Sequence, residues 1–552
     1  MNPTRSLAAA IIQNNYDRLW IYFAGPILGS VVACFFYELV ICPKASLRRT
    51  QNYLCSSSFD RKVSYESIEQ DTNTMKAYPH YTEYWKMCQI FIAEVWAAGV
   101  SHFPSFLFDT SEPNLSIVAG VIAGASYYVA LWYSFPVSGA QVSPTFTLAA
   151  LITRRLPFYL VPLYVIADFL GTLLAISISW SVSPFADQAP GTYGMTLPGK
   201  GVSNVAATFT EAGSTFILIS VGLASLDEMR DREWRPEYGA PFPLAIMVTI
   251  IVNVATTIHI SGASMNPARS LAAAIIQNNY DRLWMGFFAN LEKSNIMKSY
   301  PHYVECWKIC QIFFAEALAA SIANYCCFLM DMSEPNVPIV AGFIAGASFY
   351  IAIWCSFPVS GAHINPILTL ATLITRRLPP YLAPVYLVAD FLGTLLAMVI
   401  ASSVTPFADQ KSRTYGMTLP GKGFSDLAAT ITEAWITFVL VTVVLASLDE
   451  LRAREWRPEY GAPFPLAILL TVVINVVTTA HISGTSMNPA RSLAAAIIQN
   501  NYDRLWIYFV GPIFGTIVAC FFYELVICPK ASLQRTHRFL CSKSFDRKNP
   551  YD

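Results

Sequence analysis

The sequence predicts an all-α membrane protein, and three observations support this prediction. Of the 552 residues, 54% are hydrophobic and only 13% are charged. The mean hydropathy of +0.44 is higher than that of ordinary soluble domains. Apolar stretches recur along the chain with a length of about 20 residues, which is the length that crosses a bilayer as a helix. We therefore expect a bundle of many transmembrane helices.

An internal repeat divides the chain. The matching stretches are 78–81 with 300–303 and 265–269 with 487–491, both at an offset of 222 residues, the difference between 300 and 78. A third, partial copy opens the chain, where residues 1–7 and 17–23 match 487–493 and 503–509 almost letter for letter. Repeats of this length indicate a duplicated structural unit. The sequence therefore predicts a fragment at 1–62, a first unit at 75–284 and a complete second unit at 285–552.

The second unit contains six apolar stretches long enough to span a membrane. We place them at about 309–330, 336–357, 380–404, 428–448, 462–482 and 505–528. An odd number of spans in each half makes the two halves point in opposite directions through the bilayer. Such inverted repeats with discontinuous helices are typical of membrane channels and transporters.

Two short apolar runs lie between these spans, and each begins with Asn and Pro. They start at Asn365-Pro366 and at Asn488-Pro489-Ala490. Asn is a favoured N-cap, and Pro fits the first helical position because its missing N–H is not needed there. Both runs are too short to span. A membrane tolerates such half-helices only where protein buries them or where they line a wet cavity, so the pattern predicts a pore.

The first unit follows the same plan with two departures. Asn266-Pro267-Ala268 opens its second half-helix, but Ser143-Pro144 replaces the first Asn-Pro. Ser still caps a helix, whereas its hydroxyl cannot reproduce an amide donor, so conduction by this unit is not predicted. The unit also has no sixth span, because residues 285–298 are not apolar enough. We favour a chain assembled from tandem gene copies or a mis-joined gene model, in which Met285 would be a sensible initiator of the second unit. The alternative is that the fragment's stretch from Leu19 to Cys42 docks as the missing helix.

The distribution of charge indicates orientation and excludes some partners. The formal net charge is zero, which argues against nucleic acid as a partner. Lys and Arg gather at 375–377, 452–457 and 530–548, which we expect on the cytoplasmic side by the positive-inside rule. No nucleophile is paired with a base in a defined site. We therefore expect neither an enzyme nor a metal or cofactor.

The paired Ser-Gly-x-x-x-Asn-Pro stretches, which end at Pro366 and Pro489, closely resemble those of the aquaporin, or major intrinsic protein, family. The Ala490-Arg491-Ser492 continuation and Gly511-Pro512 in the last span carry the same resemblance. It implies an aquaporin-like six-helix bundle with two re-entrant half-helices, present here as two units plus a fragment. It also implies a homotetramer with a pore in each protomer. We expect the protein in the plasma membrane, with the termini of the complete unit in the cytoplasm.

The resemblance assigns roles to particular residues. The outer constriction is expected at Ala345, Val476, Thr485 and Arg491 in the second unit and at Ala123, Val254, Ala263 and Arg269 in the first. Buried glutamates that brace the half-helices are expected at Glu316, Glu433, Glu94 and Glu211. His363 either lines the inner mouth or only hydrogen-bonds its loop. The two half-helix N-termini carry partial positive charge that repels protons and cations.

The same residues predict the solute. Ala345 and Val476 are small and apolar, so the constriction is expected to be wider than in water-selective members of the family. Ser492 and the Tyr508-Phe509 pair are instead typical of water channels. We therefore expect a passive channel for water that also admits glycerol, urea or similar small neutral solutes. The alternative is an adhesion or structural protein of this fold with little flux. An ion-coupled transporter is not favoured, because the sequence has no cluster of acidic residues beside the half-helices.

Overall fold

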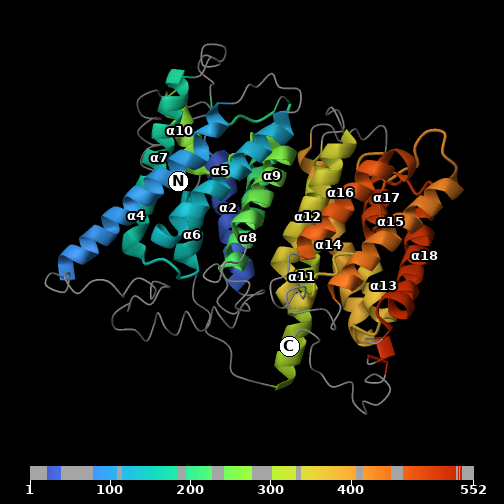
Figure 1. Ribbon diagram of the computed structural model, residues 1–552. Helices are drawn as coiled ribbons and strands as arrows, with labels where there is room; N and C mark the ends of the chain where they lie inside the picture. Colours follow the sequence, from blue (N-terminus) through green and yellow to red (C-terminus); the bar gives the residue numbers. More distant parts are fainter. Residues whose placement is uncertain are drawn as a thin grey trace. The chain divides into compact units, whose positions relative to one another are not determined.

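The computed structural model describes residues 21–38, 79–107, 115–182, 194–199, 201–226, 242–276, 301–330, 337–405, 414–448, 464–529, 532–533 and 535–536. Within these residues, ten helices are long and apolar enough to cross a membrane, and a shorter apolar helix covers Gly25–Phe36. The described secondary structure is helical throughout (Figure 1). The predicted all-α membrane fold is therefore confirmed.

The chain forms two compact units. The first comprises residues 1–229 and 235–290, and the second comprises 230–234 and 291–552. The first unit thus includes the N-terminal fragment, which the sequence alone set apart. We describe each unit by itself.

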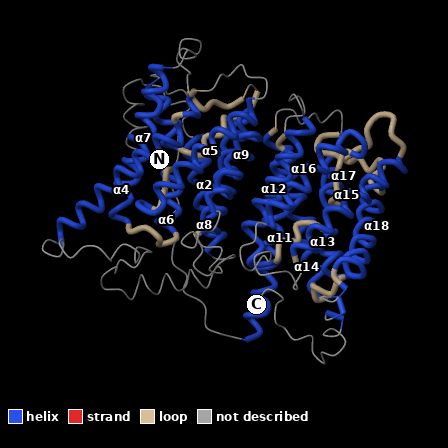
Figure 2. The backbone as a smooth tube through the Cα atoms, in the orientation of Figure 1, coloured by secondary structure: helices blue, strands red, loops and turns tan. Residues whose placement is uncertain are grey.

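The second unit is a bundle of six spans with two short helices inside it. The spans are α11 (Pro301–Phe328), α12 (Val337–Ser360), α14 (Ala383–Val404), α15 (Asp426–Ser447), α16 (Phe464–Ser483) and α18 (Ile507–Phe522), and a π-helical turn at Tyr523–Ile527 extends the last one. The half-helices are α13 (Pro366–Ile374) and α17 (Pro489–Gln499) (Figure 2). Helix α11 packs against α12 and α14, α12 against α16, and α15 against α16 and α18. All six spans lie where the sequence predicts them.

The first unit repeats this arrangement. Its helices are α4 (Pro79–His102), α5 (Leu115–Ser138), α7 (Val161–Val182), α8 (Asn204–Ser225) and α9 (Phe242–Ser261), with half-helices α6 (Pro144–Ile152) and α10 (Pro267–Ile276). Single 3₁₀ turns at Pro104–Phe106 and Phe158–Leu160 connect them, as one at Pro380–Leu382 does in the second unit. Helix α4 packs against α5 and α7, α5 against α9, and α8 against α9. These are the pairings of the second unit.

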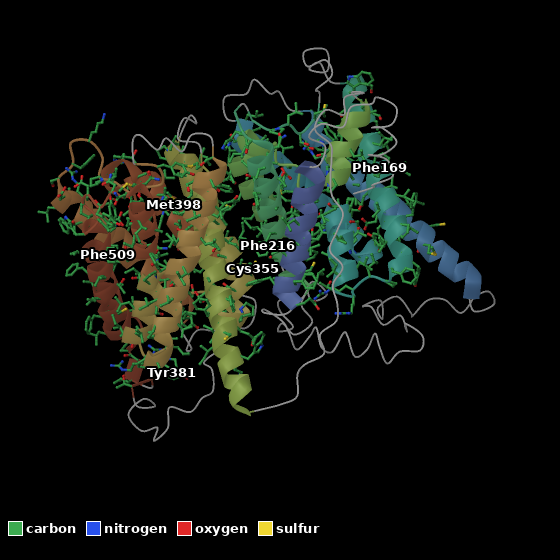
Figure 3. The ribbon with its side chains drawn as sticks, turned by 180° about the vertical axis from the view of Figure 1, so that it is seen from behind. Phe169, Phe216, Cys355, Tyr381, Met398 and Phe509 are labelled. Atoms are coloured by element: carbon green, nitrogen blue, oxygen red, sulfur yellow. The ribbon has the colours of Figure 1, made fainter. Side chains whose placement is uncertain are left out.

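Helix α2 (Ile21–Phe36), from the N-terminal fragment, occupies the sixth-helix place of the first unit. It packs against α8, as α18 packs against α15. Small residues allow the approach: a Cβ on Gly25 would lie 2.6 Å from the Glu211 Cβ, and one on Gly511 would lie 2.8 Å from the Glu433 Cβ. Figure 3 shows Phe216 of α8 beside α2, where its ring centroid lies 6.2 Å from that of Phe36.

Polar contacts of α2 repeat those of α18. Glu38 lies 3.5 Å from Arg155, just as Glu524 lies 3.4 Å from Arg377. The sulfur of Cys34 contacts the Ala149 carbonyl oxygen at 3.8 Å, which is also the distance from Cys520 to Ala371. In the structure the fragment's helix therefore docks as the sixth helix of the first unit, and the origin of the chain from tandem gene copies or a mis-joined gene model stays a prediction. Residues 285–298, where the sequence shows no sixth span, lie outside the described residues.

Candidate functional site

Asparagine side chains cap both half-helices of the second unit. Asn365 is extended, with φ −151°, and its Oδ1 accepts from the Ile367 N–H at 3.1 Å. The Oδ1 of Asn488 accepts from the N–H groups of Ala490 and Arg491 at 3.0 and 3.3 Å. Proline follows each cap, so the local sequence alone starts these helices.

The two half-helices meet at their N-termini. The Nδ2 of Asn365 donates to the Met487 carbonyl oxygen at 2.7 Å, which ties one helix start to the loop of the other. Helices α13 and α17 also contact each other directly. The Nδ2 of Asn488 is buried and meets no acceptor among the described residues. Its hydrogens are therefore left to whatever occupies the space between the helix starts, where both macrodipoles place positive charge.

Two fully buried glutamates hold the loops that lead into these helices. Glu316 accepts from the N–H groups of His363 and Ile364 at 3.1 and 2.8 Å. Glu433 accepts from Ser486 N–H and Met487 N–H, both at 2.9 Å. The loops need this support because Ile364 and Met487 have φ of 65° and 49°, in the left-handed region that costs non-glycine residues energy.

The four residues expected at the outer constriction lie on α12, α16 and the loop and start of α17. Val476 and Thr485 are buried, whereas Ala345 and Arg491 are partly exposed. The Arg491 guanidinium lies over the Phe328 ring at 5.5 Å, and its Nη1 has no hydrogen-bond partner among the described residues. The hydroxyls of Thr485 and Thr479 lie 2.8 Å apart. Arg491 therefore keeps one donor without an acceptor among the described residues, and the constriction itself stays a prediction.

His363 contacts the half-helix that follows it and a neighbouring span. Its Nδ1 lies 3.1 Å from the Thr369 hydroxyl, and its ring centroid lies 4.3 Å from that of Tyr386. The side chain is 3% exposed. These contacts tie the ring to α13 and α14, and the role of His363 at the inner mouth stays a prediction.

The first unit has the same braces at its own loops. Glu94 accepts from Gln141 N–H and Val142 N–H at 3.1 and 2.8 Å. Glu211 accepts from Ser264 N–H and Met265 N–H, both at 2.9 Å. Its constriction residues also follow the second unit: Val254 and Ala263 are buried, Ala123 and Arg269 are partly exposed, and Arg269 lies 5.5 Å from the Phe106 ring.

The helix starts of the first unit differ. Ser143 Oγ accepts from Thr145 N–H at 3.3 Å and so caps α6, ahead of Pro144. The bond to the opposite loop comes from Thr145, whose hydroxyl lies 3.5 Å from the Met265 carbonyl oxygen. Asn266 Oδ1 caps α10, which begins Pro267-Ala268, by accepting from Ala268 N–H at 2.9 Å. The bridge between the half-helices is therefore longer here than the 2.7 Å bond of Asn365.

Sequence reasoning missed three residues of the first unit. The Thr145 hydroxyl makes the contact with the opposite loop that the Asn365 amide makes in the second unit. His102 and Tyr127 contact the Asn266 side chain at 2.9 and 3.2 Å. A position-by-position comparison at the 222-residue offset would have found them, since Asn324 and Phe349 stand opposite His102 and Tyr127. Among the described residues, no three His, Cys, Asp or Glu side chains gather as metal ligands.

The fold and the paired half-helices together define a class: a multi-pass membrane protein built from duplicated bundles with re-entrant helices. The chain belongs to the major intrinsic protein family. The family's sequence model, described as "Major intrinsic protein", matches residues 1–37, 83–291 and 304–523, which are the three segments of the repeat.

Several curated relatives are aquaporins, which are channels and not enzymes. Aquaporin-4 of Bos taurus is 35% identical over 199 residues, which cover 36% of this chain and 59% of that protein. Putative aquaporin NIP4-1 of Arabidopsis thaliana is 34% identical over 195 residues, 35% of this chain and 62% of that protein. The matches thus span about three fifths of these relatives. An aquaglyceroporin structure from Plasmodium falciparum aligns at 20% identity, with a TM-score of 0.34, over 41% of this chain and 98% of that chain.

Proposed function

We propose that the second unit is a passive channel for water and that it excludes protons and ions. The observation that carries this proposal is the free amide of Asn488, which is buried at the meeting point of two helix N-termini and has no protein acceptor among the described residues. A water molecule that accepts from this amide has its oxygen pinned. It cannot readily relay a proton, and two positive helix ends repel cations.

We further propose that glycerol, urea or similar small neutral solutes pass. Ala345 and Val476 place no polar or aromatic group at the constriction, so Arg491 and Thr485 supply its polar surface. A constriction with small apolar walls is wider and admits larger neutral molecules. Ser492 and Tyr508 support water as the main solute because these residue types are typical of water channels. Both hydroxyls are bonded within the protein: that of Ser492 bonds Ser486 and Thr418, and that of Tyr508 bonds the Ser483 carbonyl oxygen.

The setting of the channel belongs to the same proposal. Exposed apolar side chains follow α14, for example Leu392 and Leu396, and they suit lipid or a second copy of the chain. We propose a homotetramer in the plasma membrane. We propose that the face with Arg376 and Arg377, at the end of α13, lies in the cytoplasm together with the termini of this unit, which the positive-inside rule supports. No nucleic acid, metal or cofactor is part of the proposal.

Stopped-flow light scattering on proteoliposomes of the full chain tests the function. Water is applied first and glycerol second, and a pH-sensitive dye inside the vesicles follows protons. We expect water flux well above that of empty vesicles, a slower glycerol flux and no proton entry. Asn488→Asp keeps the cap oxygen and removes the amide donors, so water flux should fall and cation exclusion should weaken.

Folding is checked by the thermal unfolding and the elution volume of the protein in detergent. Correctly folded full-length protein without water flux would contradict the channel and would favour the adhesion or structural alternative. Equal rates of water and glycerol would show that the constriction, and not the body of the pore, decides the solute.

A further inference from the structure

Protein groups hold the central amide of the first unit. The Nδ2 of Asn266 lies 2.9 Å from His102 Nε2, 3.2 Å from the Tyr127 hydroxyl and 3.2 Å from the Val142 carbonyl oxygen. An amide nitrogen carries two hydrogens, so three acceptors leave none for a solute. His102, Tyr127 and Asn266 are 2%, 9% and 2% exposed. These groups meet at the N-terminus of α10, at the position that Asn488 takes in the second unit.

His102 is fixed in the one tautomer that can accept from Asn266. An amide nitrogen only donates, so the His102 Nε2 must accept and its Nδ1 must carry the proton. The Nδ1 lies 2.8 Å from the Ala98 carbonyl oxygen and 2.9 Å from the Ser101 hydroxyl, which places the proton on a good acceptor. The Tyr127 ring meets the imidazole edge to face, with centroids 5.6 Å apart. The imidazole is therefore held by the contacts of its Nδ1 and by the Tyr127 ring.

The second unit lacks both groups at the same positions. Asn324 replaces His102, and its Nδ2 donates to the Ala320 carbonyl oxygen at 2.8 Å and to the Thr394 hydroxyl at 3.3 Å. Phe349 replaces Tyr127 and has no hydroxyl. The Nδ2 of Asn488 meets no acceptor among the described residues. The two amides thus differ in the His102 and Tyr127 side chains and in the bond to the Val142 carbonyl oxygen.

We propose that His102 and Tyr127 form a plug in the first unit, so that water passes only through the second. To pass the centre of the first unit, a water molecule must displace the imidazole and the phenol from Asn266, because the Asn266 amide has no free hydrogen to offer the entering water. This inference rests on the proposed channel function of the second unit. His102 and Tyr127 are the residues that close the first of the two units.

The first test moves the plug into the second unit. Asn324→His with Phe349→Tyr places in the second unit the two side chains that its copy already holds, which favours correct folding. In full-chain proteoliposomes we expect water flux to fall about tenfold or more, toward that of empty vesicles. A folded double variant that keeps half of the wild-type flux or more overturns the proposal.

The reverse exchange is the matched variant. His102→Asn with Tyr127→Phe gives the first unit the residues of the second. If the plug closes that unit, flux through the full chain should rise, up to about twofold when both pores conduct equally. Flux equal to that of the wild type would show that something other than these two residues closes the first unit, which also overturns the proposal.

A measurement without flux separates this inference from the channel function. In ¹⁵N-asparagine-labelled full chain, water-edited NMR should transfer magnetisation from water to the Asn488 amide but not to the Asn266 amide. His102→Asn with Tyr127→Phe should restore transfer to Asn266. Water contact at Asn266 in the wild type would overturn the plug. Absence of wild-type flux together with a dry Asn266 would instead contradict only the channel.

Discussion

The central asparagines of the two units differ in their partners although their surroundings match. Asn266 has three acceptors for its amide, whereas Asn488 has none among the described residues. The loops beside them are braced alike: Glu211 and Glu433 each accept from two backbone N–H groups at 2.9 Å. The bundle and its braces are thus common to both units. In the proposed channel, conduction depends on the few side chains that reach the amide.

The largest effect is expected from removing a brace. Glu433→Leu leaves Ser486 N–H, Met487 N–H and the Ser483 hydroxyl without their acceptor, at about 1–3 kcal/mol for each buried donor. The loop into α17 should lose its form, and water flux should be lost together with thermal stability. Glu211→Leu removes the same bonds from the first unit. It should lower stability as much and leave the flux in place, whereas loss of flux in this variant would contradict a closed first unit.

A smaller effect is expected where the sixth helices dock. A Cβ on Gly29 would collide with the Ala212 carbonyl oxygen, and one on Gly515 would collide with that of Ala434. Gly29→Leu should cost about 1–3 kcal/mol or more and expose α2 to protease, while water flux persists. Gly515→Leu should abolish flux. Equal loss of flux in both variants would show that α2 also supports the conducting unit.

A substitution at the constriction is expected to change the relative flux of glycerol and water and not the stability of the protein. Ala345→Phe should place a ring at the expected constriction and narrow the passage. Glycerol flux should fall about tenfold, which corresponds to about 1.4 kcal/mol in the barrier, while water flux falls less. Ala123→Phe, at the matching position of the first unit, should change neither rate in the same assay. A glycerol rate that survives Ala345→Phe would place the solute filter elsewhere.

The smallest effect is expected from restoring the missing asparagine. Ser143→Asn returns an amide to the start of α6, where it can bond the Met265 carbonyl oxygen more closely than Thr145 does. Because His102 and Tyr127 still hold Asn266, water flux should not change measurably. A rise in flux would identify Ser143, and not the plug, as the cause of closure.

Much of the fold followed from the sequence alone because its determinants are local. Apolar stretches of spanning length placed the six helices of the second unit, and Asn-Pro pairs placed the starts of α13 and α17. A cap needs only the residues next to it, so Asn365 and Asn488 cap in the structure as their local pattern predicts. The repeated motifs also sufficed to place the chain in its family.

The identity of the sixth helix of the first unit and the fate of its central amide were decided by tertiary structure. Helix α2 docks on α8, far along the chain, because Gly25 and Gly29 allow close approach to the α8 backbone around Thr208 and Ala212. His102 and Asn266 are 164 positions apart, and Thr145 and Met265 are 120 apart. No local pattern pairs such residues. Which donors are filled and which stay free depends on how the packed helices bring side chains together.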